Sequence, residues 1–305
     1  MNAVPAAHPD GLLLLDKPEG FSSTQALARA KRFLAARKAG HTGTLDPFAT
    51  GLLPIAVGEA TKFSRFLIDA PKEYLATLRL GWVSTTGDPE GEVTASGDAV
   101  SDSARIDEVL ANFMGVSAQM PPMHSAVRIG GKRLYDLARQ GQEVQRAPRR
   151  IEILGLRRRS QEGEALGMEV KCSKGTYVRT LAADIGRALG CGAYLVGLRR
   201  TAVGGFDLGE ATTLPELEAA GVEGARGRLL PVDVLVRSLP RLECLPDEAL
   251  RFTQGQVVPC PGGRPGQEFA FYGPAGRFLG VGVCQEAGQA SPERLMATGA
   301  AVQAP

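Results

Sequence analysis

Long apolar runs are missing from this 305-residue chain, since none approaches the about 18–20 residues that a membrane-spanning helix needs. The densest run, residues 12–15, is stopped by Asp16, Lys17 and Pro18. The N-terminus has neither the basic start nor the apolar core of a signal peptide. We therefore expect a globular cytoplasmic protein that does not bind membranes.

Cysteine pairs and cofactor motifs are also missing. The five cysteines lie far apart, with no Cys-x-x-Cys pair and no histidine close by in the sequence. That spacing disfavours a disulfide framework and a zinc site, so we expect reduced thiols that fill small apolar spaces. The chain has neither a Gly-Lys-Ser/Thr phosphate loop nor a Gly-x-Gly-x-x-Gly turn after a strand. It is therefore expected to use no metal and no cofactor.

Net charge is only +2, but the charges are unevenly distributed. Residues 128–159 carry ten Lys or Arg against three acids, and residues 207–248 carry nine acids against four arginines. A second basic cluster, with five Lys or Arg, lies in residues 29–38. A locally basic face on a near-neutral protein suits a polyanion docked on one side. A solvated helix face or strand edge is the alternative interpretation.

Apolar periodicity and helix signals predict a mixture of helices and strands without regular alternation, which is typical of an α+β domain. Thr85 to Asp98 is polar and is expected to be a loop. The predicted strands are 11–15, 73–80, 151–156 and 166–172. Four helices are predicted. The first starts at Ser22 or Ser23, the second starts at Asp102 or Ser103, the third covers about 134–138, and the fourth contains Leu181 and ends at Gly190.

The composition changes near residue 235. A short helix at 247–253 and two apolar strands, 269–272 and 278–284, are separated by segments rich in Gly and Pro. They predict a small β-rich domain appended to the large one. We place the large domain at 1–238 and the small one at 239–290, and we expect 291–305 to be a mobile tail, since it has few apolar residues to bury.

The most informative segment is the glycine-rich stretch 40–54, in which Asp46 is the only acid. Glycines mark backbone that adopts unusual dihedral angles or approaches a ligand closely. A carboxylate with no second acid beside it acts alone, as a nucleophile or a general base. Taken in isolation, Asp46-Pro47 also fits the N-cap and first residue of a helix.

Several blocks in this chain resemble the motifs of TruB-type tRNA pseudouridine synthases, and they occur in the family's order. The blocks cover residues 11–201, about two thirds of the chain, and their number and order favour a catalytic Asp46 over a helix cap. They are LDKPEG at 15–20, GHTGTLDP at 40–47, GLLP at 51–54, GEATKF at 58–63, KEY at 72–74, CSKGTYVRT at 172–180 and LRRT at 198–201.

This resemblance implies a catalytic domain with a mixed or antiparallel sheet and flanking helices, followed by a small PUA-like β-barrel. It implies the isomerisation of uridine to pseudouridine at position 55 in the TΨC loop of tRNA, without metal or cofactor. The expected partner is the T-arm of tRNA, with no obligatory protein partner and a monomeric enzyme. Two alternatives stay open, a guide-RNA-dependent synthase of ribosomal RNA and a tRNA-folding chaperone that needs no chemistry.

The resemblance also assigns roles to individual residues. Asp46 is the expected nucleophile, and Arg179 is the cation that keeps a buried carboxylate ionised. Tyr74 is expected to support the extruded uracil and to take part in proton transfer at C5. Whether Asp46 attacks the ribose or the base, or first removes a ribose proton, stays open at this level.

Further residues are expected to contact the substrate. Tyr177 and Leu198 would line the pocket, and His41 would fill the space that flipped nucleotides leave. Lys17 and Lys62 are candidates for phosphate contacts, with a structural role as the alternative. His124 departs from the tyrosine that is frequent in the family, so no role is assigned to that side chain.

Overall fold

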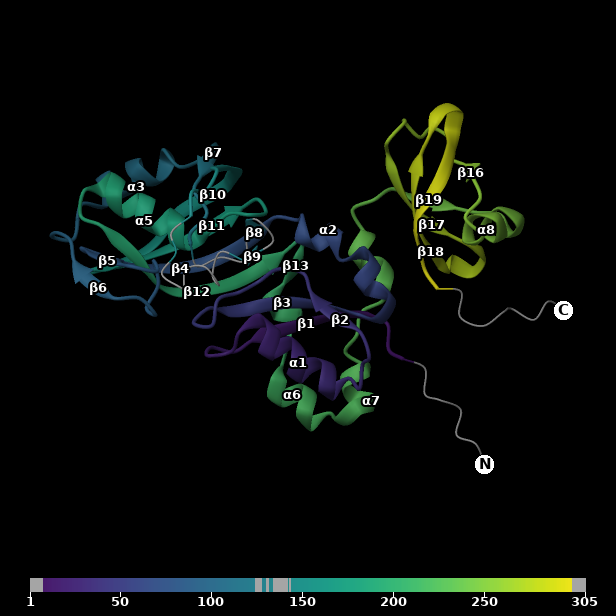
Figure 1. Cartoon of the computed structure of the whole chain (residues 1–305), viewed down its shortest axis with the longest axis horizontal. Helices are drawn as coiled ribbons and strands as arrows, with labels where there is room; N and C mark the ends of the chain where they lie inside the picture. The colour runs from purple at the N-terminus through teal and green to yellow at the C-terminus, as the bar shows by residue number, and fades with distance from the viewer. Residues whose placement is uncertain (1–7, 124–127, 130–131, 134–141, 143, 298–305) are drawn as a thin grey trace.

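The computed structural model describes residues 8–123, 128–129, 132–133, 142 and 144–297 (Figure 1). A large domain contains all the motif blocks, and a smaller domain formed by the C-terminal part lies to one side of it (Figure 1). Within these residues, no helix is long and apolar enough to cross a membrane.

The large domain is built on one mixed sheet, to which the described residues contribute ten strands. Eight of them follow the order β14-β1-β3-β12-β4-β11-β10-β7, with β2 paired to β3 and β13 paired to β12. Their bounds are β1 (Gly11–Lys17), β2 (Ala39–His41), β3 (Thr50–Val57), β4 (Lys72–Leu80), β7 (Gly115–Gln119), β10 (Arg149–Glu162), β11 (Ala165–Cys172), β12 (Ala193–Val203), β13 (Phe206–Asp207) and β14 (Thr212–Thr213).

Helices and short ribbons surround this sheet. The ribbons are β5 (Trp82–Ser84) with β6 (Val93–Ala95) and β8 (Arg128–Ile129) with β9 (Lys132–Arg133). The α-helices are α1 (Ser23–Phe33), α2 (Arg65–Ile68), α3 (Ser103–Ala111), α5 (Val178–Leu189), α6 (Leu214–Ala219), α7 (Gly221–Arg226) and α8 (Pro246–Thr253). The 3-10 helices are η1 (Gly58–Phe63), η2 (Leu208–Glu210), η3 (Val232–Val236), η4 (Pro274–Gly276) and η5 (Glu286–Gly288).

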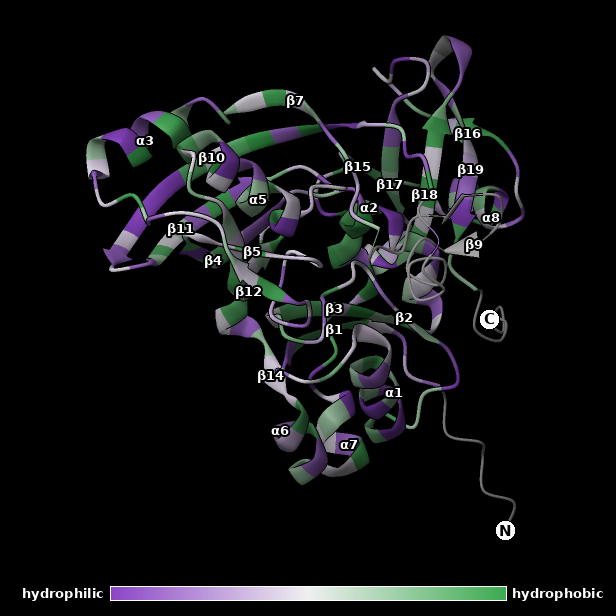
Figure 2. Ribbon diagram, turned by 60° about the vertical axis from the view of Figure 1, so that its left-hand side comes forward, coloured by the Kyte–Doolittle hydropathy of each residue, from purple (hydrophilic) through white to green (hydrophobic). Residues whose placement is uncertain are grey.

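The register of the sheet places α1 and α5 on the same face. Arg200 of β12 lies opposite Tyr74 of β4 and opposite Gly51 of β3, so all three point to one side. On that side, β4 and β12 pack against α5, while β1 and β3 pack against α1. The opposite face of β1 and β3 packs against η3 and the C-terminal domain. Since both of their faces are covered, β1 and β3 are hydrophobic along most of their length (Figure 2).

Most predicted elements are present, for the reasons that the sequence suggests. Ser22 caps α1 in a capping box with Gln25, and Asp102 caps α3. α5 ends at Gly190, whose φ of 83° is a left-handed conformation that favours glycine. The predicted loop at 85–98 was wrong in part, because it contains β6. The helix predicted at about 134–138 lies outside the described residues.

The C-terminal domain is a curled five-stranded sheet packed against α8, as expected for a PUA-like domain. Its strand order is β15-β17-β18-β19-β16. The domain runs further than predicted, because residues 291–295 belong to a strand that pairs on both sides, with β18 and with β16, and buries Ala290. The bounds are β15 (Arg241–Glu243), β16 (Val258–Pro259), β17 (Glu268–Tyr272), β18 (Phe278–Cys284) and β19 (Gln289–Leu295).

Candidate active site

A cavity of about 630 Å³ opens on the sheet face that carries α1 and α5. Its walls come from β2, the loop 42–49, α2, β4, the start of β10, the segment 173–177, α5 and β12. Six of the eight residues predicted to act in catalysis or substrate binding line it together. They are His41, Asp46, Tyr74, Tyr177, Arg179 and Leu198.

Asp46 lies in a tight turn rather than at the start of a helix. The Ala49 N–H donates to the Asp46 carbonyl at 3.1 Å, with Pro47 at the second position of the turn, and the chain then enters β3. Proline favours that position because its fixed φ matches it. The helix-cap interpretation of Asp46 is therefore wrong, and its carboxylate is available to the cavity.

Arg179 joins the Asp46 carboxylate to a second, buried carboxylate. Its Nε lies 3.0 Å from Asp46 Oδ2, and its Nη1 lies 2.7 Å from Asp88 Oδ2. The side chains of Arg179 and Asp88 are 6% and 4% exposed, whereas that of Asp46 is 32% exposed. The guanidinium is thus fixed from behind, while the carboxylate in front of it keeps access to the cavity. A charge-assisted contact of this kind favours the ionised form of a carboxylate.

Buried side chains hold the backbone on the N-terminal side of Asp46. Ser23, at the start of α1, accepts from the Leu45 N–H at 2.8 Å and donates to the Leu45 carbonyl at 3.0 Å. Arg200 donates to the carbonyls of Gly43 at 3.1 Å and Thr44 at 3.3 Å. It also reaches the carbonyl of Leu52 in β3 at 2.7 Å. These contacts connect the loop to β12 and α1, and Arg200 also ties β12 to β3.

Lys17 holds the other side of Asp46 and is fully buried. Its Nζ donates to the carbonyls of Pro18 at 2.9 Å, Phe21 at 2.6 Å and Pro47 at 3.3 Å. Burial lowers the pKa of Lys17 to about 8, and the negative charge of Asp46 opposes that shift. Lys17 does not line the cavity, so its ammonium serves the loop next to Asp46.

Two lining residues are basic groups whose charged forms are disfavoured. Burial, and then the charge of Arg200, lowers the pKa of Lys72 to about 8, and its Nζ donates to the carbonyls of α2 and the following turn. Burial, and then Arg200, also lowers the pKa of His41. The Nδ1 atom of His41 is buried and has no hydrogen-bond partner among the described residues. A neutral ring with one unsatisfied nitrogen is suited to meet a polar edge of a ligand.

The two tyrosines of the cavity are held in different ways. Tyr74 lies on β4 opposite Arg200, and burial raises the pKa of its phenol, so the hydroxyl stays protonated. Tyr177 precedes α5, and its backbone is fixed by the side chain of Gln119 at the end of β7. The Gln119 amide accepts from the Tyr177 N–H at 2.8 Å and donates to its carbonyl at 3.1 Å.

Lys62 lies outside the cavity, at the contact between the two domains. Its Nζ is 2.6 Å from Glu59 Oε2 and donates to the carbonyl of Leu295 in β19 at 3.0 Å. Arg149, Arg150 and Lys174, which were not singled out as site residues, do line the cavity. The cations at the cavity are therefore not the two lysines predicted from the motifs.

Comparison with known proteins agrees with these motifs over nearly the whole chain. Residues 31–178 match the family model of the TruB family pseudouridylate synthase N-terminal domain. Residues 179–237 match the tRNA pseudouridylate synthase B C-terminal domain, and residues 240–296 match the model described as pseudouridine synthase II TruB, C-terminal. The tRNA pseudouridine synthase B of Aromatoleum aromaticum is 51% identical over 294 residues, which cover 96% of this chain and 95% of that protein. The chain belongs to the TruB family of pseudouridylate synthases.

Other members and solved structures support the same assignment. The tRNA pseudouridine synthase B of Azoarcus sp. is 50% identical, with 97% of each chain covered. The crystal structure of a Cbf5–Nop10–Gar1 complex matches with a TM-score of 0.74 at 27% identity, covering 96% of this chain and 90% of that one. An H/ACA RNP bound to a substrate RNA containing 2'-deoxyuridine matches with a TM-score of 0.72 at 26% identity, covering 93% and 84%. The predicted fold is confirmed.

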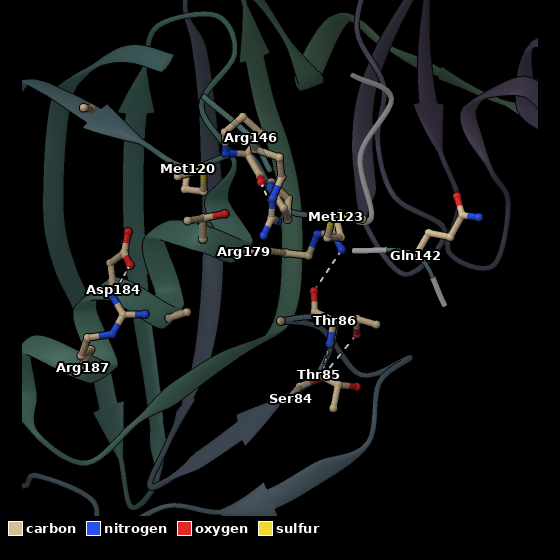
Figure 3. A pocket seen from close by; sticks show the side chains of 16 residues that line it. Ser84, Thr85, Thr86, Met120, Met123, Gln142, Arg146, Arg179, Asp184 and Arg187 are labelled. Carbon is tan, nitrogen blue, oxygen red and sulfur yellow. Dashed lines mark hydrogen bonds and ion pairs between the residues drawn. The ribbon is translucent and has the colours of Figure 1, made fainter. Parts of the chain in front are cut away.

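A second cavity lies behind the active site of this TruB family member, with Arg179 in both walls. It has a volume of about 790 Å³ and is lined by the 84–87 turn, one face of α5 and residues 118–123 (Figure 3). The Arg179 Nη1 donates to the Thr86 carbonyl at 3.1 Å. Arg146 also lines this cavity and donates to the Pro121 carbonyl at 3.1 Å. His124, where the chain departs from the TruB pattern, lies outside the described residues.

Besides Arg149, Arg150 and Lys174, the sequence analysis gave no role to Lys72, Arg200 and Asp88 of this TruB site. Lys72 and Arg200 stand inside the quoted blocks, next to Tyr74 and Leu198, so the signal was present but had been left without a role. Asp88 lies in the polar segment that was expected to be a loop, and nothing there marks it as the partner of an arginine 91 residues later. No group of three or more His, Cys, Asp or Glu is placed to hold a metal within the described part of the chain.

Proposed function

We propose that this chain isomerises uridine to pseudouridine at position 55 in the TΨC loop of tRNA. One observation carries the proposal, namely a partly exposed Asp46 carboxylate paired at 3.0 Å with a buried Arg179 at the wall of a cavity lined by Tyr74, Tyr177 and Leu198. Its relatives named tRNA pseudouridine synthase B support the substrate class.

The target base has to leave its stack before it can be rearranged, which costs a few kcal/mol. Tyr74 and Tyr177 offer aromatic faces, and Leu198 an apolar wall, that compensate for the lost stacking. The His41 ring, whose Nδ1 has no partner among the described residues, lies on the same wall and is suited to meet the RNA beside the extruded base. A loop with unstacked bases is the type of RNA that proteins read in this way.

Asp46 then acts as the nucleophile that permits detachment and reattachment of the base. Ionisation is required for that role, and Arg179 favours it even when bound RNA excludes water from the site. Asp88 binds another nitrogen of the Arg179 guanidinium at 2.7 Å. It therefore holds the guanidinium in place when the Asp46 carboxylate moves. Tyr74 keeps its proton, so its hydroxyl is a hydrogen-bond donor towards the base and a route for proton exchange at C5.

A guide-RNA-dependent activity is the second candidate, since the matching solved structures include H/ACA assemblies. Relatives at 50–51% identity are named as tRNA enzymes, whereas the H/ACA match is 26% identical, so the tRNA assignment is favoured. The cytoplasmic location, the monomeric state and the absence of an obligatory protein partner stay predictions.

The test uses an unmodified tRNA transcript and the purified protein without guide RNA or other proteins. We expect pseudouridine at position 55 with the wild type, and a rate at least about 10⁴-fold lower with Asp46→Asn, as is typical when a nucleophile is removed. Pseudouridine is mapped by chemical derivatisation and primer extension. No product from the wild type would contradict the stand-alone tRNA activity.

Asp184→Asn is the matched control, because Asp184 is a half-buried carboxylate of α5 that does not line the active-site cavity and pairs with Arg187. We expect wild-type turnover from this variant. Thermal unfolding of both variants verifies that the fold is retained. Equal turnover by Asp46→Asn and Asp184→Asn would remove Asp46 from the mechanism while leaving the reaction intact.

A further inference from the structure

The two basic clusters of the sequence have different surroundings in the fold. Arg157 and Arg159 of β10 share Glu169 of β11, with Arg159 Nη1 at 2.8 Å from its Oε1. Arg158 forms two hydrogen bonds, of 2.9 and 2.8 Å, to the carboxylate of Asp107 in α3. Two carboxylates therefore offset two of these three charges, which leaves one net positive charge to attract a polyanion.

The other cluster is not balanced. We call it the basic ridge and define it as Arg29, Lys31, Arg32, Arg37 and Lys38. Among the described residues, no carboxylate forms an ion pair with a member of the ridge, and Arg37 Nη1 lies 3.4 Å from the Nε2 atom of His8. Glu59, whose charge interacts with Lys38, is already paired with Lys62 at 2.6 Å. The sequence contains no acid between Glu19 and Asp46.

Arg29, Lys31 and Arg32 lie on α1, and Arg37 and Lys38 lie in the connection from α1 to β2. α1 covers the same sheet face as the active-site cavity. Ala26, Ala30 and Leu34 turn towards the sheet, so Arg29 and Arg32 point outward. The two guanidiniums lie 5.1 and 5.4 Å from the ring centroids of Phe21 and Phe33, which restricts them to the helix surface.

Each end of the ridge is close in sequence to a residue of the active site. Ser23 at the start of α1 bonds to Leu45, next to Asp46, and a rise of about 1.5 Å per residue places Arg29 and Arg32 about 9 and 14 Å along the helix. At the other end, β2 runs from Ala39 to His41 in the cavity wall, about 10 Å beyond Lys38 at strand spacing. Phosphates within about 10–20 Å of the target nucleotide are thus within reach.

We infer that the basic ridge binds the phosphate backbone of the stem that closes the target loop of the substrate RNA. This inference rests on the proposed function for the identity of the RNA. A row of exposed, unpaired cations gains free energy from phosphates by releasing counterions, without reading sequence. The RNA therefore spans the active site, with the extruded base at Asp46 and its stem on α1.

The test compares two triple variants that remove the same charge. One is Arg29→Gln, Arg32→Gln and Lys38→Gln in the ridge, and the other is the paired triplet Arg157→Gln, Arg158→Gln and Arg159→Gln. Both are made in the Asp46→Asn background, so that the RNA is not modified during the measurement. Filter binding of unmodified tRNA and of a T-arm hairpin is recorded from about 50 to 200 mM salt, the range over which phosphate contacts show a steep dependence.

We expect the ridge variant to bind both RNAs more weakly and to reduce the slope of log Kd against log salt by about 2–3, one step of about 0.7–0.9 per lost contact. The paired-triplet variant should keep the parental slope within about 0.5, less than one lost contact. Equal slopes for the two variants would overturn the inference, since only net charge would then matter. An effect on tRNA but none on the hairpin would overturn the placement on the stem.

Pseudouridine formation by the wild type is measured separately, so failure of the proposed function is distinguishable from failure of this inference.

Discussion

The cations around the Asp46 loop and the cations of the basic ridge are the same residue types in opposite surroundings. Lys17, Arg179 and Arg200 are 0–5% exposed, and their donors reach backbone carbonyls or carboxylates of the protein. Arg29 and Arg32 of the ridge are exposed and have no carboxylate partner among the described residues. Burial makes a cation part of the scaffold, because its charge must be satisfied internally, whereas exposure leaves its charge available to a partner.

The strongest test of this contrast is removal of Arg200. Arg200→Met leaves the carbonyls of Gly43, Thr44 and Leu52 without this donor in a buried site. Each unsatisfied group costs about 1–3 kcal/mol, so we expect the free energy of unfolding to fall by about 3–5 kcal/mol. Urea denaturation followed by circular dichroism measures the change. Activity should fall as well, since the loop that carries Asp46 loses one of its ties.

Arg199 provides the control, because it is the neighbouring arginine on the opposite face of β12. Its side chain is 41% exposed and pairs with Asp16 at 2.7 Å. A half-exposed pair contributes little, so Arg199→Met should cost about 1 kcal/mol or less. Similar costs for the two variants would contradict the view that burial, rather than residue type, decides what an arginine does here.

A smaller effect is expected when the charge behind Arg179 is removed. Asp88→Asn keeps the shape of the side chain but loses the carboxylate that accepts from Arg179 Nη1 at 2.7 Å and from Thr86 Oγ1 at 2.5 Å. The guanidinium is then held less firmly against Asp46, and we expect kcat to fall about 10–100-fold, the loss of about 1.4–2.7 kcal/mol of transition-state stabilisation.

Single-turnover rates at saturating tRNA measure this effect without interference from binding. The Asp184→Asn variant again serves as the reference for loss of one carboxylate near α5. An unchanged single-turnover rate for Asp88→Asn would show that the Asp88 carboxylate is not needed to orient Arg179.

The sequence predicted residues that line the cavity better than the residues that support them. Asp46, Tyr74 and Arg179 were singled out because their neighbours form recognisable blocks, and the structure brings all three to one cavity. Asp88 and Arg200 were missed, because a carboxylate or guanidinium in a sequence carries no sign of how deeply it will be buried. Long-range pairing decides that, and periodicity describes only local structure.

The limits of the fold prediction have the same origin. The helix caps Ser22 and Asp102 are each one of the two candidates that the sequence offered, because capping depends on residues close in sequence. The end of the C-terminal domain was placed too early, since residues 289–295 are mostly polar and become a strand only through pairing with β18 and β16. Pairing partners distant in sequence supply the order that local composition does not.

The smallest expected effect is the pH dependence of the stability that Lys17 contributes. It tests whether the buried Lys17 is more stable as the neutral amine or as the hydrogen-bonded ammonium. Burial lowers the pKa of Lys17 from 10.5 to about 8, so between these values the unfolded chain holds a proton that the folded protein has released. Stability therefore rises with pH across this window, and this contribution is lost as the pH falls through 8. Relative to Lys17→Met, the wild type should gain at most about 1.4 kcal/mol per pH unit.

Urea denaturation of the wild type and Lys17→Met at pH 7.5, 8.5 and 9.5 measures that gain as a difference, in which Lys72 cancels because both proteins contain it. Lys38→Met, from the basic ridge, controls for the loss of an exposed lysine. If the free energy of unfolding of the wild type instead falls relative to Lys17→Met as the pH rises, the folded protein favours the ammonium form of Lys17. The hydrogen bonds to Pro18, Phe21 and Pro47 would then outweigh the effect of burial. The buried lysine would then act as a charged tie like Arg200, and deprotonation would loosen the turn that holds Asp46.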